Sequence, residues 1–473
     1  MRSAIIRWGV CGLVLLTLAC GSSTDAADSG VPDGGIPDSG TRDSGVPVGT
    51  GTLTVTLSDA PAGAAVQVSG PNGFAQTLTS SQTLTQLVPG SYAITAAAVR
   101  QPGQIVDTLF DPAPGATTVP VTSGQTATAT VTYAVRPGTG ALYVPSPNTG
   151  EVFAYTDAML ANAGPLLTDG GIPPPPANAT TLSLKLEDGG TWLGPEGVSV
   201  NAQGELWVAM NDEGSAVEGL ASFSGTQQAT GGALRPQRFL SPFQTDAGTL
   251  SLSYPEATTF DSSGNLWVAS PGSPAALSAI GSATLASDGG VAVPDRLWDI
   301  PADGLAFDRD GNLWYSVCTG SAGIFQIAAK DLGSTTAPTP VVSIANETNH
   351  DCPENIAFDS AGNLFVAECG NLVGISKYPS WQLADGGSNG TNSEPAVVVT
   401  NPQFNCITGV AVDNADNLWV TDYFNGNPVL YEFGKDQLGT SGSPAPLRAF
   451  SFASCTYCGI AFNPPAVNLP MAQ

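Results

Sequence analysis

The segment PENIAFDSAGNLFVAE, residues 353–368, recurs along this chain, and its recurrence decides the fold. Related segments begin at Pro195, Pro255, Ala302 and Ile407. Their spacing is roughly 45 to 60 residues, a period that is typical of solenoids and propellers. The sequence therefore predicts a repeat protein, with at least five copies of one supersecondary unit.

Two incomplete copies flank the five complete ones. Residues 141–144 (ALYV) match the second half of the repeat, and residues 457–463 (YCGIAFN) match the first half. Together they predict a sixth unit that is divided between the two ends of the repeat region.

Each copy has the same internal order of strands and turns. Residues 355–358 are expected to form a first strand, which leads through the turn 359–362 into a second strand over 363–367. Asp359 can bond its own backbone in that turn, and Gly362 can adopt a positive φ. Further apolar runs, 374–378 and 396–399, predict a third and a fourth strand. Four antiparallel strands per repeat make a propeller blade.

The core pattern P-x-G-[IVL]-A-[FV]-D-x-x-G-N-L-[WF]-V-A resembles NHL-repeat propellers and the related SMP-30/gluconolactonase family, over about residues 141–465. The resemblance implies an all-β, six-bladed β-propeller with four-stranded blades. The strand around Ile460 is expected to join the sheet begun at Leu142, which hides strand edges. One aromatic position is expected to pack between blades. It is occupied by Trp207, Trp267, Trp314, Phe365 and Trp419.

The N-terminus has the pattern of an export signal. Arg2 and Arg7 precede a short apolar run over 10–18, and Cys20 follows Leu-Ala. This arrangement resembles the lipobox of bacterial lipoproteins, in which Cys20 would be acylated. Gly21, rather than aspartate, then suggests the outer membrane, on its periplasmic face or at the cell surface. An ordinary signal peptide that ends further on is the alternative.

The chain is predicted to have four parts. Residues 1–20 are the signal peptide, and 21–49 are a disordered Gly/Asp/Ser/Pro tether that contains almost no apolar residues to bury. Residues 50–136 alternate apolar and polar residues in short bursts, which predicts a small β-sandwich. It resembles immunoglobulin-like or carboxypeptidase-regulatory-like modules and is expected to act as a spacer. Residues 137–473 form the propeller.

The formal net charge of −26, with only 14 Lys and Arg, argues against nucleic acid as a partner. It also argues against membrane contact through a basic patch, so the lipid anchor is the expected membrane attachment. The partner is expected to be a protein, a glycan or a small molecule at the propeller face, and its identity is not specified by the charge.

Six cysteines follow Cys11 and Cys20, an even number in a chain that is expected to be exported. The end of a second strand and the start of the next blade's first strand lie on one face, which predicts two disulfides between blades. The remaining pair would close a tight loop. The predicted pairs are Cys318–Cys352, Cys369–Cys406 and Cys455–Cys458. A metal site at Cys455-x-x-Cys458 is the alternative, but zinc would need further Cys or His ligands.

Acidic residues occupy one repeat position, five residues before the turn residue. They are Glu196, Glu256, Asp303 and Glu354, followed in the last two units by Thr408 and Cys458. Repeat symmetry is expected to direct them toward the mouth of the central channel, where mutual repulsion would raise their pKa values. Such oxygen ligands suit Ca²⁺ or another divalent cation. Alternatively, they solvate a strand end or cap backbone amides.

The resemblance supports the metal interpretation in part. In SMP-30-like lactonases, acid and amide residues at this kind of position hold one divalent metal. The stretch around Asp303 is close to that family's P-D-G-L, and Pro195-Glu196-Gly loosely matches its E-G-P. The family's asparagine ligands have no clear counterparts, and no catalytic residue is assigned.

His350 and Asp351 precede Glu354 and are candidates for a ligand pocket, with a general base as one role for the histidine and plain solvent exposure as the alternative. No phosphate loop or H-E-x-x-H motif occurs in the sequence. Two functions remain. The favoured one is a membrane-anchored binding module, and the alternative is a divalent-metal-dependent lactonase or esterase-like hydrolase.

Overall fold

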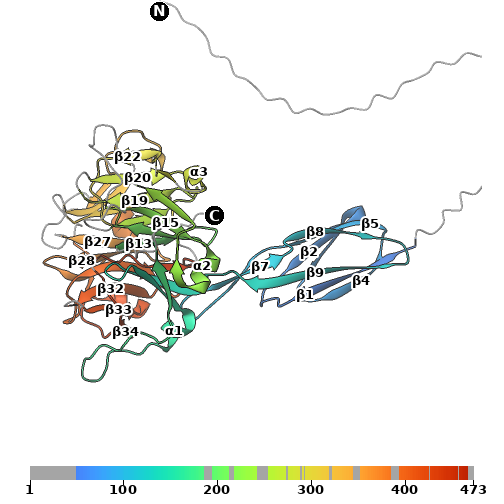
Figure 1. Cartoon of the computed structure of the whole chain (residues 1–473), viewed down its shortest axis with the longest axis horizontal. Coiled ribbons are helices and arrows are strands. Elements are labelled where there is room, and N and C mark those ends of the chain that lie inside the picture. Colours follow the sequence, from blue (N-terminus) through green and yellow to red (C-terminus); the bar gives the residue numbers. More distant parts are fainter. Residues whose placement is uncertain are drawn as a thin grey trace, which may run out of the picture. The chain divides into compact units, whose positions relative to one another are not determined.

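A computed structural model describes residues 49–185, 194–211, 218–241, 254–272, 275–287, 290–291, 293–318, 322–344, 352–384, 394–424, 427–455 and 457–466. The expected signal peptide, Cys20 and the tether up to residue 48 lie outside these ranges. The described part consists mainly of β-strands (Figure 1). None of its helices is long and apolar enough to cross a membrane.

The N-terminal strands form two sheets, in which most strand pairs are antiparallel, around one hydrophobic core. The first sheet has the order β4 (Gln82–Leu87), β1 (Gly51–Ser58), β9 (Thr126–Val135), β7 (Thr108–Ala113), β6 (Val99–Gln101). The second has the order β3 (Phe74–Leu78), β2 (Val66–Gly70), β5 (Gly90–Ala96), β8 (Ala116–Val121). Leu53 and Val55 of β1 alternate with half-buried threonines, so one face of the strand supplies the core. Strand β1 pairs with β9 in parallel, and this sheet therefore mixes both directions.

The repeats form six sheets in the described part of the chain. Each sheet takes four strands from one predicted unit, and the first two sheets gain a fifth strand from the next unit. The first sheet has the order β16 (Gly232–Leu234), β12 (Thr180–Leu184), β11 (Glu151–Thr156), β10 (Ala141–Ser146), β35 (Ala461–Asn463), and the second has the order β13 (Pro195–Val200), β14 (Leu206–Met210), β15 (Gly219–Phe223), β17 (Arg238–Ser241), β21 (Gly290–Val291). The third has the order β18 (Ala257–Phe260), β19 (Leu266–Ser270), β20 (Ala276–Ile280), β22 (Arg296–Trp298), and the fourth has the order β23 (Leu305–Phe307), β24 (Leu313–Val317), β25 (Gly323–Ile327), β26 (Val342–Ile344). The fifth has the order β27 (Pro353–Phe358), β28 (Leu364–Cys369), β29 (Val373–Tyr378), β30 (Val397–Val399), and the sixth has the order β31 (Ile407–Val412), β32 (Leu418–Phe424), β33 (Asn427–Phe433), β34 (Arg448–Ser451). The first-listed strands of the last five sheets and β35 line one common cavity, so the sheets are blades of a β-propeller.

The repeated Asp-x-x-Gly-Asn turn explains why each unit folds as a hairpin. In the fourth blade, Oδ1 of Asp308 accepts hydrogen bonds from the backbone N–H groups of Asp310 (3.0 Å) and Asn312 (2.9 Å). Oδ2 of Asp308 accepts a hydrogen bond from Nε1 of Trp314 at 2.8 Å. The same carboxylate therefore closes the turn and anchors the aromatic residue of the next strand.

The asparagine of the turn holds a short helical segment that the sequence pattern does not predict. Each blade has such a segment between its third and fourth strands: α1 (Asp157–Asn162), α2 (Gly225–Thr230), α3 (Ser282–Leu285), η2 (Ala329–Asp331), α4 (Ser380–Ala384) and η3 (Lys435–Gly439). In the fourth blade, Oδ1 of Asn312 accepts a hydrogen bond from the N–H of Ala329 at 2.9 Å. Asn265, Asn363 and Asn417 make the equivalent bond in their own blades.

The aromatic column packs between blades, as expected. Trp314 contacts Phe358 of the next blade edge to face, with ring centroids 5.9 Å apart. Trp267 and Trp419 make the corresponding contacts with Phe307 and Phe462. These tryptophans are therefore part of the core and not of a binding surface.

The second blade departs from the turn pattern because Asn201 replaces the aspartate. Its amide bonds to Glu205 at 2.8 Å and does not reach the indole of Trp207. Nε1 of Trp207 and Oγ of Ser222, on paired positions of β14 and β15, are buried and have no hydrogen-bond partner within the described part.

The propeller closes through its two incomplete repeats. Strand β35 pairs with β10 in antiparallel register, with Leu142 opposite Phe462. Disulfides Cys318–Cys352 and Cys369–Cys406 link successive blades, and Cys455–Cys458 closes a short loop beside β35. These are the three pairs predicted from the cysteine spacing, and no thiol of these six remains for a metal.

Candidate functional site

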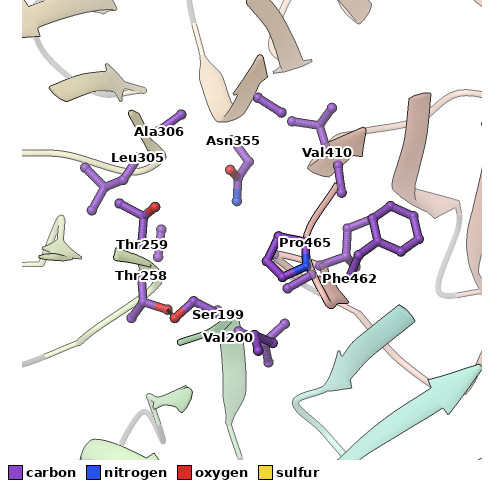
Figure 2. A pocket seen from close by; sticks show the side chains of 18 of the residues that line it. Ser199, Val200, Thr258, Thr259, Leu305, Ala306, Asn355, Val410, Phe462 and Pro465 are labelled. Atoms are coloured by element: carbon purple, nitrogen blue, oxygen red, sulfur yellow. Dashed lines mark hydrogen bonds between the residues drawn. The ribbon is translucent and has the colours of Figure 1, made fainter. Parts of the chain in front are cut away.

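The innermost strands enclose a channel that is mainly apolar (Figure 2). Its cavity has a volume of about 190 Å³ and receives side chains from all six blades. The walls are largely valine, alanine, isoleucine and phenylalanine. The polar side chains of Ser199 and Thr258 bond to each other at 2.9 Å, so their hydroxyls add little polarity to the wall.

The structure brings the four predicted acids together at one end of this channel. Each acid directly precedes a cavity-lining residue or the glycine beside it, so the acids lie one level beyond the cavity. Burial raises the pKa of the Tyr457 hydroxyl, and four surrounding carboxylates raise it further; they belong to Glu354, Glu256, Glu196 and Asp303. The charges of all four acids therefore act on one tyrosine. We call these four residues the acidic ring.

Burial is the main cause of the altered pKa values in the acidic ring, ahead of the repulsion expected from the sequence. It raises the pKa of Asp303 to about 6. The N–H of Cys318 donates a hydrogen bond of 2.7 Å to this carboxylate and thereby opposes the rise in pKa. It raises the pKa of Glu354 well above the usual range, and the charges of Asp303, Glu256 and Glu368 add to the effect. Burial therefore favours the neutral form of both carboxyl groups.

Asn211 is a polar neighbour of the acidic ring that the repeat pattern did not single out. Its Nδ2 donates to Oε2 of Glu196 at 3.0 Å. The side chain is only 6% exposed, and its Oδ1 has no hydrogen-bond partner among the described residues. Asn211 lies four residues after Trp207. Cys318 and Cys369 occupy the same position in their own repeats, and this correspondence could have identified Asn211 from the sequence.

Glycines one residue beyond the ring position let neighbouring inner strands approach closely. A Cβ atom on Gly304 would lie 2.4 Å from the carbonyl oxygen of Glu354, and one on Gly409 would lie 1.9 Å from that of Cys458. Such distances exclude a side chain at these positions. The glycines therefore hold the ring residues of successive blades side by side.

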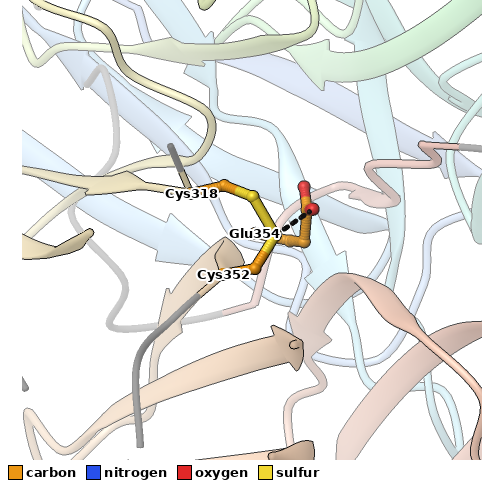
Figure 3. Close-up of side chains that lie close together, drawn as sticks. All are labelled: Cys318, Cys352 and Glu354. Carbon is orange, nitrogen blue, oxygen red and sulfur yellow. Dashed lines mark hydrogen bonds between the residues drawn. A yellow bond between two sulfur atoms is a disulfide. The ribbon is translucent and has the colours of Figure 1, made fainter. Parts of the chain in front are cut away.

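The acidic ring is wide. No three of its carboxylates come within 4.8 Å of one another in the described part of the chain. The one three-residue group that does so comprises Cys318, Cys352 and Glu354 (Figure 3). Its two sulfur atoms are joined in a disulfide, and it is therefore not a metal site.

The other sequence candidates fall elsewhere. His350 and Asp351 lie outside the described residues, as does Cys20. Thr408 and Cys458 complete the repeat position without adding acids. Oγ1 of Thr408 lies 3.5 Å from Sγ of Cys455, so this side of the channel mouth is neutral and is occupied by a disulfide.

Comparisons with known proteins give structural likenesses only. No family model matches the sequence, and no curated protein matches it. A virginiamycin B lyase from Staphylococcus aureus is 14% identical, with a TM-score of 0.34 over 53% of this chain and 75% of the other. A candidate gluconolactonase is 15% identical, with a TM-score of 0.34 over 60% and 87% of the two chains. A luciferin-regenerating enzyme is 16% identical, with a TM-score of 0.37 over 67% and 92%. The propeller assignment follows from the strand pairing of this chain itself.

Proposed function

We propose that this chain is a lipid-anchored, extracytoplasmic binding module whose propeller takes a cation at the acidic ring. The observation that carries the proposal is the convergence of four acids from four successive blades at one end of the channel, where a single tyrosine senses them all.

The donor atoms suit a hard cation. Carboxylate and amide oxygens are the ligands that Ca²⁺ prefers. The buried Oδ1 of Asn211, which lacks a hydrogen-bond partner among the described residues, is an oxygen of this kind next to Glu196. Because the ring is too wide for three carboxylates to bind one ion together, a divalent ion would keep several waters.

Thermal unfolding of the full chain with and without Ca²⁺ tests the proposal. A ligand at one hundred times its Kd stabilises the native state by about 2.7 kcal/mol, and we expect a corresponding rise in Tm. Glu256→Gln and Asp303→Asn should each abolish the rise. Asp310→Asn, in an exposed turn, is the matched control and should keep it. A chain that responds neither to Ca²⁺ nor to organic cations would refute a cation site.

The anchor has its own test. A chain with Cys20→Ala should remain in the soluble fraction and lose incorporation of a labelled fatty acid. Equal labelling of both chains would contradict acylation at Cys20.

A divalent-metal-dependent lactonase or esterase-like hydrolase is the second candidate. The Glu196–Asn211 pair favours it, because Nδ2 of the amide donates to the carboxylate and its Oδ1 has no hydrogen-bond partner among the described residues. These two residues would hold the metal, which would polarise an ester carbonyl when bound. Hydrolysis of chromogenic lactones that is lost in both Glu196→Gln and Asn211→Leu, with Tm unchanged, would support this candidate. Absence of hydrolysis with Ca²⁺ bound would exclude it for those substrates.

A further inference from the structure

We propose that the acidic ring and the apolar channel beneath it form one site for an amphiphilic organic cation. A quaternary ammonium head would lie in the ring, and its alkyl chain would extend into the channel. This inference rests on the proposed cation site and names the class of ligand that the site takes.

The width of the ring favours a large cation. Divalent metals bind oxygen at 2.0–2.6 Å, which requires ligands that converge closely. The ring carboxylates do not converge in this way, since no three come within 4.8 Å in the described residues. A quaternary ammonium group carries its charge on a larger surface and is attracted by carboxylates that surround it at greater distance.

Tyr457 supplies an aromatic ring at the same place. Its side chain is 45% exposed, although it belongs to a repeat position that is otherwise proline, alanine or isoleucine. All four ring carboxylates act on its hydroxyl. Aromatic rings near carboxylates attract quaternary ammonium groups through cation–π interactions of about 0.5–2 kcal/mol. The buried oxygen of Asn211, which has no hydrogen-bond partner in the described part, adds a further partial negative charge.

The channel is suited to an alkyl chain. Its volume of about 190 Å³ exceeds the roughly 150 Å³ of a dry apolar cavity that binds benzene. Small side chains form one of its levels, among them Ala306, Ala357 and Ala411. The four strand residues that follow the ring extend about 13 Å along the channel, at about 3.3 Å per residue.

Ring and channel meet at the level of Asn355. Its side chain points into the channel (Figure 2), and its Nδ2 lies 3.1 Å from the place where a Cβ of Gly459 would be. Because residue 459 is glycine, the amide fits against its backbone and itself occupies the space between the ring and the apolar walls. For an alkyl chain to pass at this level, the Asn355 side chain would have to adopt another rotamer.

A ligand series on the full chain tests the inference without any mutation. Isothermal titration calorimetry would compare tetramethylammonium with butyl-, hexyl- and octyltrimethylammonium, below micelle-forming concentrations. Because each buried methylene contributes about 0.8 kcal/mol, we expect affinity to rise about fourfold per methylene until the channel is full. Octanol and octanoate should bind at least tenfold more weakly than octyltrimethylammonium.

Two variants test separately the binding of the ammonium head and of the alkyl chain of the ligand. Ala306→Leu fills the channel and should remove the dependence on chain length while tetramethylammonium and Ca²⁺ still bind. Tyr457→Leu should weaken every quaternary ammonium ligand by about three- to tenfold and leave the Ca²⁺ response unchanged. Ala361→Leu, at an exposed turn, is the control for added bulk and should change neither.

The outcomes distinguish this inference from the proposed function. Binding of cations with no dependence on chain length would overturn the amphiphile and keep the cation site. Equal binding of octanol would overturn the role of the ring in this ligand. Failure of every cation, Ca²⁺ included, would overturn both.

Discussion

Phenylalanine substitutions at Trp314 and Trp207 measure how much the hydrogen bond from the indole to the turn carboxylate contributes to the free energy of unfolding. Both indoles occupy the same repeat position, and both are 1% exposed. Nε1 of Trp314 donates to Asp308, whereas Nε1 of Trp207 has no acceptor within the described residues. The two substitutions thus remove the same volume, and only one of them removes a hydrogen bond.

The magnitudes follow from these two contacts. The lost volume costs roughly 1 kcal/mol in each variant. Trp314→Phe also loses a hydrogen bond to a charged acceptor, which is worth about 1.5–3 kcal/mol. Trp207→Phe instead removes a buried donor without a partner, which offsets much of its volume cost. We expect Trp314→Phe to lower the free energy of unfolding by about 3 kcal/mol and Trp207→Phe by less than about 1 kcal/mol.

Urea unfolding followed by far-UV circular dichroism measures both variants, and equal m-values license the comparison of midpoints. Trp267→Phe serves as the control, because Trp267 bonds Asp261 at 3.1 Å and should behave like Trp314. If Trp207→Phe were as destabilising as Trp314→Phe, the hydrogen bond would not be the stabilising element of the turn.

Three further predictions concern stability. Replacing Cys318 and Cys352 together by serine should cost about 2–4 kcal/mol in urea unfolding, because the disulfide closes a long loop in the unfolded chain; an unchanged midpoint would contradict this. Gly409→Ala should destabilise by several kcal/mol, since its Cβ would meet a carbonyl oxygen at 1.9 Å, whereas Gly439→Ala, with open space around it, should be neutral; similar Tm values would refute the close approach. Because the pKa of Asp303 is raised to about 6 in the folded state, the native state binds the extra proton, and Tm without added cations should rise as pH falls from 7 to 4; Asp303→Asn should flatten this dependence, and an unaltered profile would exclude Asp303 as its source.

The blade could be predicted because its information is local. The turn at Asp308 is closed by bonds to residues two, four and six positions along the chain, so one short pattern specifies the hairpin and its packing residue. Repetition of that pattern then specifies the ring of blades. The helical segments were not predicted. Asn312 bonds the first residue of one such segment, Ala329, seventeen residues further along the chain, and the residues between them share no pattern from blade to blade.

The acidic end of the channel was predictable only in outline. Repeat symmetry places the acids at one level, but whether their oxygen atoms meet depends on the width of the channel, which no local pattern encodes. Asn211 was missed because it comes from the end of a second strand and joins Glu196 only after the hairpin has folded. Tyr457 was missed because it lies within the segment 455–458, whose two cysteines were interpreted only as a disulfide.

The asymmetry of the channel mouth follows from the two repeat positions that are not acidic. Cys458 is held in a disulfide, and Thr408 contacts that disulfide, so this side of the mouth offers neither charge nor mobile ligands. Tyr457 is attached to the same neutral side and senses the acids of the other blades. In the proposed site, a cation attracted by the four acids would therefore meet an aromatic ring from the remaining side. The departure from the repeat, more than the repeat itself, would then allow the mouth to select the chemistry of a cation beyond its charge.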